Sequence, residues 1–439
     1  MFQVLRNAWK ITDLRKKILY TLFIILIFRI GSIISVPFVD PEVIKEMSQS
    51  SSNVFLNTLT MISGGGFSNA SIFALSIQPY INASIIIQLL TVAIPPLERM
   101  AKDGEAGRKK LGQITRYCTV GLGLMLGIAY YFMVRNNYGA LVPEAKSGAW
   151  GWFAGIVIVL CFTAGSALMM WLGEQINEKG IGNGISILLF AGIISRLPTA
   201  LTYLWSLFYE GGIKVMNQGG GIKNIILVPI IIILFLVIIG FIVFMNDAER
   251  RIPVQYAKRV VGRKMYGGQS TFIPIKVNMS GVMPIILATS IISMPSVLAG
   301  FFGWDNWFFR MFTPANGVYL ALEFILIIAF AFFYVTIQYN PLEMSNNLRK
   351  NSGAIPGYRP GKPTTDYIKR VLSKVTFIGA LFLGIIAVFP GLFGIIAGQS
   401  YTGLTLGGTS VMIIVGVALE TTQQIESQMM MRHYKGFLE

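Results

Sequence analysis

The chain has 439 residues, of which 54% are hydrophobic and only 13% are charged, and its formal net charge is +16. Its mean hydropathy of +0.63 is too high for a soluble protein of this length, whose helices would need charged faces. We therefore predict an all-α polytopic membrane protein, because a bilayer leaves unsatisfied any backbone that is not in a helix or a closed barrel.

Apolar runs long enough to cross a bilayer recur along nearly the whole chain. A hydrocarbon core of about 30 Å needs about 20 apolar residues in a helix, and the runs predict ten transmembrane helices. No charge occurs between Lys374 and Glu420, a stretch too long for one crossing, and we expect Pro390, Gly391 and the glycines of 398–403 to divide it in two. The first eight predicted spans are 18–36, 72–94, 114–134, 152–172, 185–204, 225–245, 281–302 and 318–339.

The distribution of basic residues predicts the orientation. With a cytoplasmic N-terminus, ten crossings return the C-terminus to the cytoplasm, and 28 of the 36 Lys and Arg residues then lie in cytoplasmic segments. Arg29 lies within the first span. Residues 1–17 mix apolar and basic side chains as an interfacial helix does, and 425–439 form a cytoplasmic tail. No small-residue cleavage pattern follows the first span, so we predict no removable signal peptide.

The sequence carries no pattern for catalysis or metal binding. Two Cys and one His cannot build a multi-ligand His/Cys metal site, and the phosphate-binding, zinc-protease and nucleophile-elbow motifs are missing. We predict that the chain is not an enzyme and has no cofactor. Any nucleotide energy used in transport must then come from another protein.

Two apolar segments near the second span allow alternative interpretations. Residues 53–67 are too short to cross and end in Gly64, Gly65 and Gly66, a triplet that ends a helix and permits a sharp turn. They fit either a half-helix folded into an outer cavity or an interfacial helix with a loose loop. Ile77, Ile81 and Ile85 recur every four residues and share one helical stripe, which fits helix packing, lipid contact or a pore lining.

Two cytoplasmic loops, 246–276 and 340–374, carry seven basic residues each. Such charge provides a docking surface for an acidic or RNA-containing partner. It also fits positive-inside bias with contact to anionic lipids. Acidic residues are scarce near mid-membrane, which weighs against an ion-coupled small-solute transporter; such a transporter is the second interpretation, and a membrane-embedded enzyme is the third.

Six longer motifs carry the most specific signal. They are SIFALSIQPYINASIIIQLL (71–90), GEQINEKGIGNGISI (173–187), RRIPVQYAKR (250–259), GGQSTFIPIKVNMSGVMPII (267–286), NPLEMSNNLRKNSGAIPGYRPG (340–361) and GGTSVMIIV (407–415). In order and topology they resemble the SecY family of channel subunits in bacterial protein translocases. The resemblance implies an hourglass of two inverted, pseudo-symmetric halves of five helices, 18–205 and 206–424.

The resemblance also implies the functional residues, in four groups. An aliphatic pore ring would contain Ile77, Ile81, Ile85, Ile185, Leu189, Val282, Ile286 and Ile413. A plug over about 54–66 would contain Val54, Phe55, Leu56, Leu59, Met61, Ile62, Gly64, Gly65 and Gly66. Polar contacts across a lateral gate would be made by Gln88, Thr115 and Asn278. Docking would involve Arg251, Lys258, Arg259, Arg263, Lys264, Lys350, Arg359 and Lys362.

The expected function is passage of unfolded secretory polypeptides across the bacterial cytoplasmic membrane, with lateral release of hydrophobic segments into lipid. A dry aliphatic constriction blocks ions and still parts around an extended chain. The partners implied are the small subunits SecE and SecG, the SecA motor ATPase, the ribosome with its RNA and proteins, signal peptides and unfolded preproteins, and anionic lipids.

Overall fold

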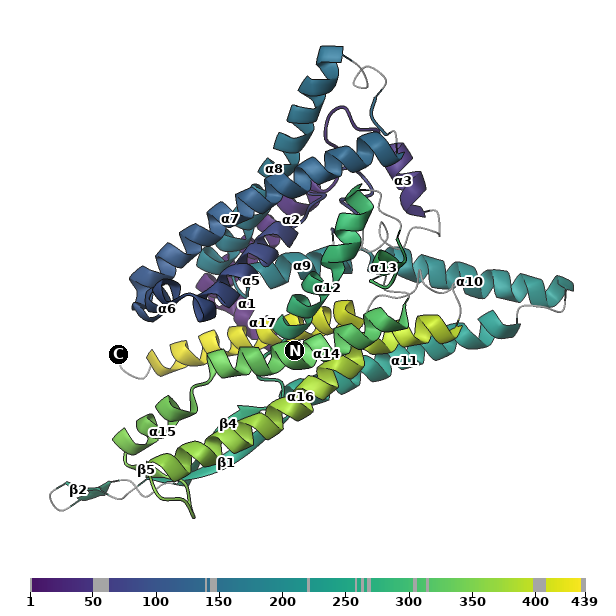
Figure 1. Ribbon diagram of the computed structural model, residues 1–439. Coiled ribbons are helices and arrows are strands. Elements are labelled where there is room, and N and C mark those ends of the chain that lie inside the picture. The colour runs from purple at the N-terminus through teal and green to yellow at the C-terminus, as the bar shows by residue number, and fades with distance from the viewer. Residues whose placement is uncertain are drawn as a thin grey trace. The chain divides into compact units, whose positions relative to one another are not determined.

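The computed structural model describes residues 2–49, 63–138, 140–142, 148–218, 222–256, 259–261, 264–266, 270–302, 306–312, 316–397 and 408–435. These residues are mostly helical (Figure 1), and the chain divides into two compact units. Unit 1 comprises Met1–Gly219, Ser293–Asn316 and Val417–Glu439. Unit 2 comprises Gly220–Ile292 and Gly317–Gly416. The predicted halves, 18–205 and 206–424, stay a prediction.

The helices follow the apolar runs of the sequence. Unit 1 holds α1 (Phe2–Lys10), α2 (Thr12–Gly31), α3 (Pro41–Gln49), α5 (Gln78–Ala93), α6 (Pro95–Lys102), α7 (Gly104–Phe132), the π-helix η1 (Met133–Tyr138), α8 (Gly148–Lys179), α9 (Gly184–Ile194), α10 (Leu197–Gln218) and α13 (Trp307–Arg310). Unit 2 holds α11 (Ile222–Asp247), α14 (Gly317–Gln338), α15 (Pro341–Lys350) and α16 (Lys362–Ala397). Both units contain residues of α12 (Met283–Phe302) and of α17 (Gly408–Lys435).

Within the described part of the chain, six helical segments are long and apolar enough to cross a membrane, or seven with the pair α5–α6, which bends by 102°. The six are 104–135, 150–179, 184–206, 228–247, 317–350 and 362–392. The remaining three predicted spans coincide with α2, α12 and α17. The chain is therefore a multi-pass membrane protein.

The helix of the second predicted span begins later than the apolar run. Residues 72–77 form turns, and α5 starts at Gln78. Ser76 has a left-handed backbone (φ 53°), which interrupts a helix, and Pro79 occupies the first turn, where its missing N–H leaves no bond unmade. The helix ends at Ala93 because Pro95 and Pro96 follow.

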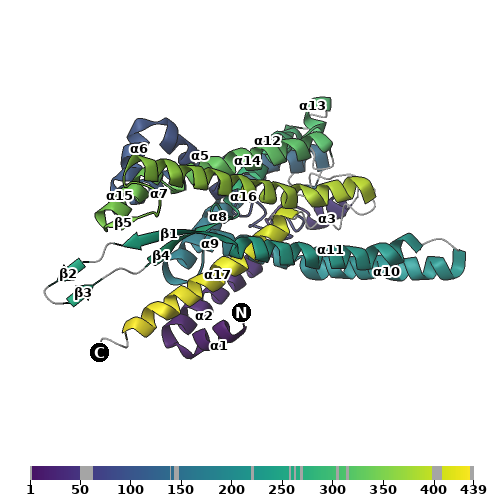
Figure 2. The ribbon, with the colours of Figure 1, turned by 90° about the horizontal axis from the view of Figure 1, so that it is seen from below.

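Pro390 and Gly391 do not divide the long apolar run, because α16 continues through both residues to Ala397. The glycines of 398–403, the other residues expected to divide it, lie outside the described residues, and the next helix, α17, begins at Gly408. Gly391 instead allows close packing against α14. A Cβ on Gly391 would lie 2.4 Å from Leu320 Cδ2. In unit 2 the two helices α14 and α16 run side by side (Figure 2), and small residues are what permits such an approach in a membrane.

The segment 63–77, which precedes α5, is packed into unit 1. Val36 N–H donates to the Ala70 carbonyl at 2.9 Å, and Ile72 N–H donates to Ile34 at 3.0 Å. Phe67 stacks edge-on against Tyr130 of α7, with ring centroids 5.0 Å apart. Val36, Phe67, Ala70 and Tyr130 belong to one buried aromatic and aliphatic cluster, and Ile72 packs against it. The cluster fixes where the chain enters α5.

The basic loops of unit 2 contain strands that the sequence analysis did not predict. β1 (Glu249–Tyr256) pairs antiparallel with β4 (Ser270–Lys276) and with β5 (Gly353–Ala354). Strands β2 (Arg259–Val261) and β3 (Lys264–Tyr266) form a separate pair. Alternate β1 residues, Ile252 and Val254, are buried in a core with Leu348 of α15 and Ile368 of α16. Strands β1, β4 and β5, helix α15 and the start of α16 therefore form one folded platform (Figure 1).

Candidate functional site

The turn between α8 and α9 explains the residues of the motif at 173–187. Asn183 caps α9 by accepting the Ile185 N–H at 3.1 Å, and the Asn177 side chain accepts the Gly184 N–H at 2.8 Å. Gly182 has φ +86°, a conformation that side chains rarely adopt. A Cβ on Gly184 would lie 1.9 Å from the carbonyl oxygen of Gly173. The start of α9 is therefore fixed backbone-to-backbone on α8.

This close approach brings together the predicted ring residues of unit 1. Around the position of a Gly173 Cβ, Ile77 Cδ1 lies at 3.5 Å and the Ile185 backbone nitrogen at 3.8 Å. The start of α5 and the start of α9 thus meet at one point on α8. Ile81 and Ile85, on the next turns of α5, are each 7% exposed, and Leu189, on the next turn of α9, is 6% exposed. The stripe is therefore largely covered by protein.

Unit 2 holds the other three predicted ring residues. Val282 precedes α12 and is buried, while Ile286 of α12 and Ile413 of α17 are half-buried. Val282 Cγ1 lies 2.9 Å from the position of a Gly416 Cβ. Because Gly416 is three residues beyond Ile413, Val282 packs one helical turn from Ile413.

The glycine triplet lies partly within the described residues. Gly64 and Gly65 have φ of +62° and +94°, which favours glycine, and Gly66 packs against Ser71. The described part, 63–66, is a turn. The other predicted plug residues lie outside the described residues; they are Val54, Phe55, Leu56, Leu59, Met61 and Ile62.

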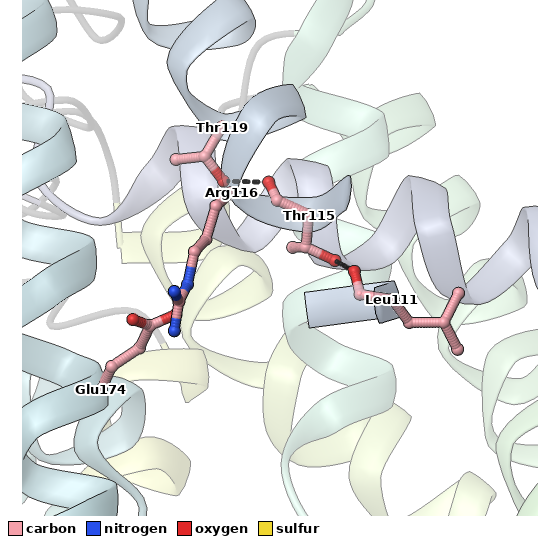
Figure 3. A network of polar contacts seen from close by, with 5 residues as sticks. All are labelled: Leu111, Thr115, Arg116, Thr119 and Glu174. Carbon is pink, nitrogen blue, oxygen red and sulfur yellow. Dashed lines mark hydrogen bonds and ion pairs between the residues drawn. The ribbon is translucent and has the colours of Figure 1, made fainter. Parts of the chain in front are cut away.

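The predicted gate residues differ in their surroundings. Gln88 is exposed on α5, whereas Thr115 is buried on α7 and donates its hydroxyl to the Leu111 carbonyl at 2.9 Å (Figure 3). Asn278 is buried in unit 2, where its amide nitrogen donates to Asn246 Oδ1 at 2.7 Å. Both Thr115 and Asn278 are thus already bonded within their own units.

An ion pair next to Thr115 was missed by the sequence analysis. Arg116 Nε lies 2.8 Å from Glu174 Oε1 and joins α7 to α8 (Figure 3). The partners are 58 residues apart, so no local spacing predicts the pair. Half of the Arg116 side chain is exposed, and a pair of this kind contributes about 1 kcal/mol or less.

The docking residues with described side chains lie on the platform of unit 2. Lys350, Arg359 and Lys362 are exposed at the end of α15, in the turn that follows and at the start of α16. The turn is held by the Thr364 hydroxyl, which donates to the Arg359 carbonyl at 2.8 Å. Arg251 Cζ lies 4.7 Å from the Phe272 ring centroid. Four residues have side chains outside the described part: Lys258, Arg259, Arg263 and Lys264.

Long apolar helices, buried aliphatic positions on α5 and α9 and a basic folded platform define a polytopic helical membrane protein. A family model described as SecY matches residues 71–422. The SecY subunit of the protein translocase from Halalkalibacterium halodurans is 42% identical, and that from Streptomyces coelicolor is 43% identical, each over 100% of both chains. The chain belongs to the SecY family.

Solved structures agree in fold. A structure described as a protein-conducting channel covers 94% of this chain and 92% of its own, with a TM-score of 0.63 and 17% identity. A second, on the plug domain of a SecY protein, has the same score and coverage at 18% identity. A yeast Ssh1 complex bound to a ribosome has a TM-score of 0.59 at 16% identity and covers 92% of this chain and 88% of its own. With its family membership, the chain is a protein-conducting channel subunit and not an enzyme.

Proposed function

We propose that this channel passes unfolded secretory polypeptides through an aliphatic constriction and releases hydrophobic segments sideways into lipid. The constriction would be formed by the eight predicted ring residues. The observation that carries the proposal is the meeting of Ile77 and Ile185 around Gly173 within unit 1, with Ile81, Ile85 and Leu189 buried on the following turns. An aliphatic ring blocks water and ions and offers no fixed hydrogen-bond pattern, so it tolerates nearly any extended sequence.

Lateral release follows from the energetics of insertion. A charged residue costs about 2.5–3.5 kcal/mol at the bilayer centre, whereas Leu or Ile gains about 0.3–0.6 kcal/mol. A client segment of about 20 apolar residues therefore gains by entering lipid. We propose Gln88, Thr115 and Asn278 as polar residues at the edges of this gate, and residues 54–66 as a plug that seals the channel at rest.

The cytoplasmic platform is the proposed docking surface. Lys350, Arg359 and Lys362 are exposed at and beside a turn that is held by hydrogen bonds. Lys350 and Arg359 belong to the motif at 340–361, which resembles the SecY family. We propose that the SecA motor and the ribosome bind this platform. We also propose that both termini are cytoplasmic, and that SecE and SecG complete the complex in the bacterial cytoplasmic membrane. Signal peptides and preproteins are the proposed substrates, and anionic lipids the proposed surroundings of the basic segments.

The test is site-specific crosslinking of a stalled secretory chain in the reconstituted complex. A photoreactive residue replaces Ile81, Ile286 or, as a control, Phe244, which is 69% exposed on α11. We expect crosslinks to the client at 81 and 286 and none at 244. Crosslinks at 244 alone would contradict the constriction. Solute flux without any motor or client would favour a small-solute transporter instead.

A further inference from the structure

Arg29 is a charged residue within the first predicted span, and its partner is a backbone carbonyl. The Arg29 guanidinium donates from Nη2 to the Ala191 oxygen, in the last turn of α9. That carbonyl also accepts the Ser195 N–H, at the long distance of 3.3 Å. The last carbonyls of a helix carry partial negative charge and lack full intrahelical partners, so a cation is stabilised there. Arg29 therefore fastens α2 to the carboxyl end of α9.

The same end of α9 contacts the turn 63–66 at Gly64. A Cβ on Gly64 would lie 2.8 Å from Gly192 Cα and 2.9 Å from its oxygen, so the two backbones touch. The Ser195 hydroxyl lies 2.8 Å from the Gly192 carbonyl oxygen and 3.3 Å from that of Gly64, and it donates to both. The Gly64 turn thus rests on the helix end that Arg29 holds.

Helix α9 connects these contacts of Arg29 and Gly64 to the proposed pore ring. Leu189 precedes Gly192 by three residues and therefore lies one turn away on a neighbouring face. A displacement of α9 at Leu189 reaches Gly192 and Gly64 through one rigid helix. We propose that Arg29 is a positioning residue, which holds the carboxyl end of α9 against the Gly64 turn and thereby keeps residues 63–66, the described end of the proposed plug, in position. This inference rests on the proposed function of residues 54–66.

The consequence is a resting channel whose closure depends on a bond remote from the constriction. A bond that exists only in the closed arrangement shifts the open-to-closed ratio by its own strength. Loss of a charge-assisted hydrogen bond of this kind shifts such a ratio by about tenfold or more. A client with a weak signal sequence, which supplies less free energy for opening, would then pass more readily.

The test compares Arg29→Gln, Arg29→Lys and Ser195→Ala with Arg135→Gln in reconstituted complexes at equal amounts of folded channel. Arg135 is a matched control, because its guanidinium bonds to the Tyr131 hydroxyl at 3.1 Å within η1 and α7. The readouts are resting ion conductance and passage of a client with a shortened signal sequence. We expect about tenfold more leak for Arg29→Gln, partial rescue by Arg29→Lys, severalfold more leak for Ser195→Ala, and no change for Arg135→Gln.

Resting leak identical to that of the unmodified channel in Arg29→Gln would overturn the inference. If that variant fails to assemble, Ser195→Ala decides alone, since it removes one hydroxyl at a half-buried position; a tight Ser195→Ala channel would equally overturn it. Ile81→Ser distinguishes failure of this inference from failure of the proposed constriction. Leak from Ile81→Ser with none from the Arg29 and Ser195 variants refutes only the proposed role of Arg29. Absence of leak in all of these variants refutes the proposed constriction as well.

Discussion

Adding one methyl group at Gly184 should loosen the channel without touching a ring residue. In Gly184→Ala the new Cβ would lie 1.9 Å from the Gly173 carbonyl oxygen and 3.0 Å from Ile176 Cβ. Ordinary contact begins at 3.4 Å, so the start of α9 must move by about 1.5 Å, the difference between 3.4 and 1.9 Å. The obstructing atom is backbone, and no side-chain rotation relieves the clash.

The magnitude follows from two terms. Overpacking a close contact costs about 1–3 kcal/mol. The shift also lengthens the 2.8 Å bond from Gly184 N–H to Asn177, which contributes about 0.5–1.5 kcal/mol. We expect Gly184→Ala to lower the free energy of unfolding by about 2–4 kcal/mol. Because Ile185 and Leu189 move with the helix, resting ion leak should rise as well.

The assays are thermal unfolding of the purified complex in detergent and ion conductance in vesicles. Gly121→Ala is the matched control, since a Cβ on Gly121 of α7 meets nothing within 4 Å. That variant should be neutral or more stable by up to about 1 kcal/mol, from helix propensity alone. Equal unfolding midpoints and equal leak for the two variants would refute the reasoning that Gly184 is required for close contact.

Three further predictions concern the ring, the docking turn and the platform. Ile81→Ser should raise resting conductance severalfold, because a hydroxyl lets water enter the constriction. Ile86→Ser, at an exposed position of the same helix, should leave the conductance unchanged. Equal conductance of the two variants would count against a seal at Ile81. Arg359→Glu should abolish most SecA-driven secretion in vesicles and leave the unfolding midpoint unchanged, since the side chain is exposed; undiminished secretion would argue against docking there. Ile252→Ala, at a position 1% exposed, should cost about 2–5 kcal/mol and speed amide hydrogen exchange in β1; unaltered exchange would show that this core does not hold the sheet.

The spanning helices were predictable because membrane solvation leaves a strong local signal. Uncharged runs near 20 residues mark helices whatever their neighbours are. Their ends were not, because they depend on particular contacts. Ser76 interrupts the second run through its left-handed backbone, and α16 continues through Gly391, where Leu320 packs closely. Neither effect is visible from composition.

The platform was missed although part of its signal is local. Ile252 and Val254 alternate with exposed residues in β1, and Ile273 and Ile275 do so in β4, the period of a half-buried strand. The runs are short and lie among basic residues, which favoured a loop interpretation. Pairing with β5, a hundred residues later, has no local signal at all.

Candidate site residues were accessible mainly through resemblance. Spacing placed Ile77, Ile81 and Ile85 on one stripe but left lipid contact and packing open. The reason for the glycines of the 173–187 motif emerges only from the contact of Gly184 with Gly173. That contact depends on a turn of the chain, so it cannot be read from either residue alone.

Several pairs of backbone segments in unit 1 touch at glycines, and these contacts determine which parts of the proposed ring can move. In lipid, helices gain little from the hydrophobic effect when they associate, so small residues and close backbones supply the attraction. Gly165 of α8 would place a Cβ 2.0 Å from the Ile72 carbonyl, Gly184 contacts Gly173, and Gly64 contacts Gly192. Backbone contacts of this kind do not yield by side-chain rotation, whereas Leu and Ile side chains have alternative staggered rotamers. The glycine contacts therefore fix the backbone of unit 1, and the proposed constriction can widen around a client at its aliphatic side chains.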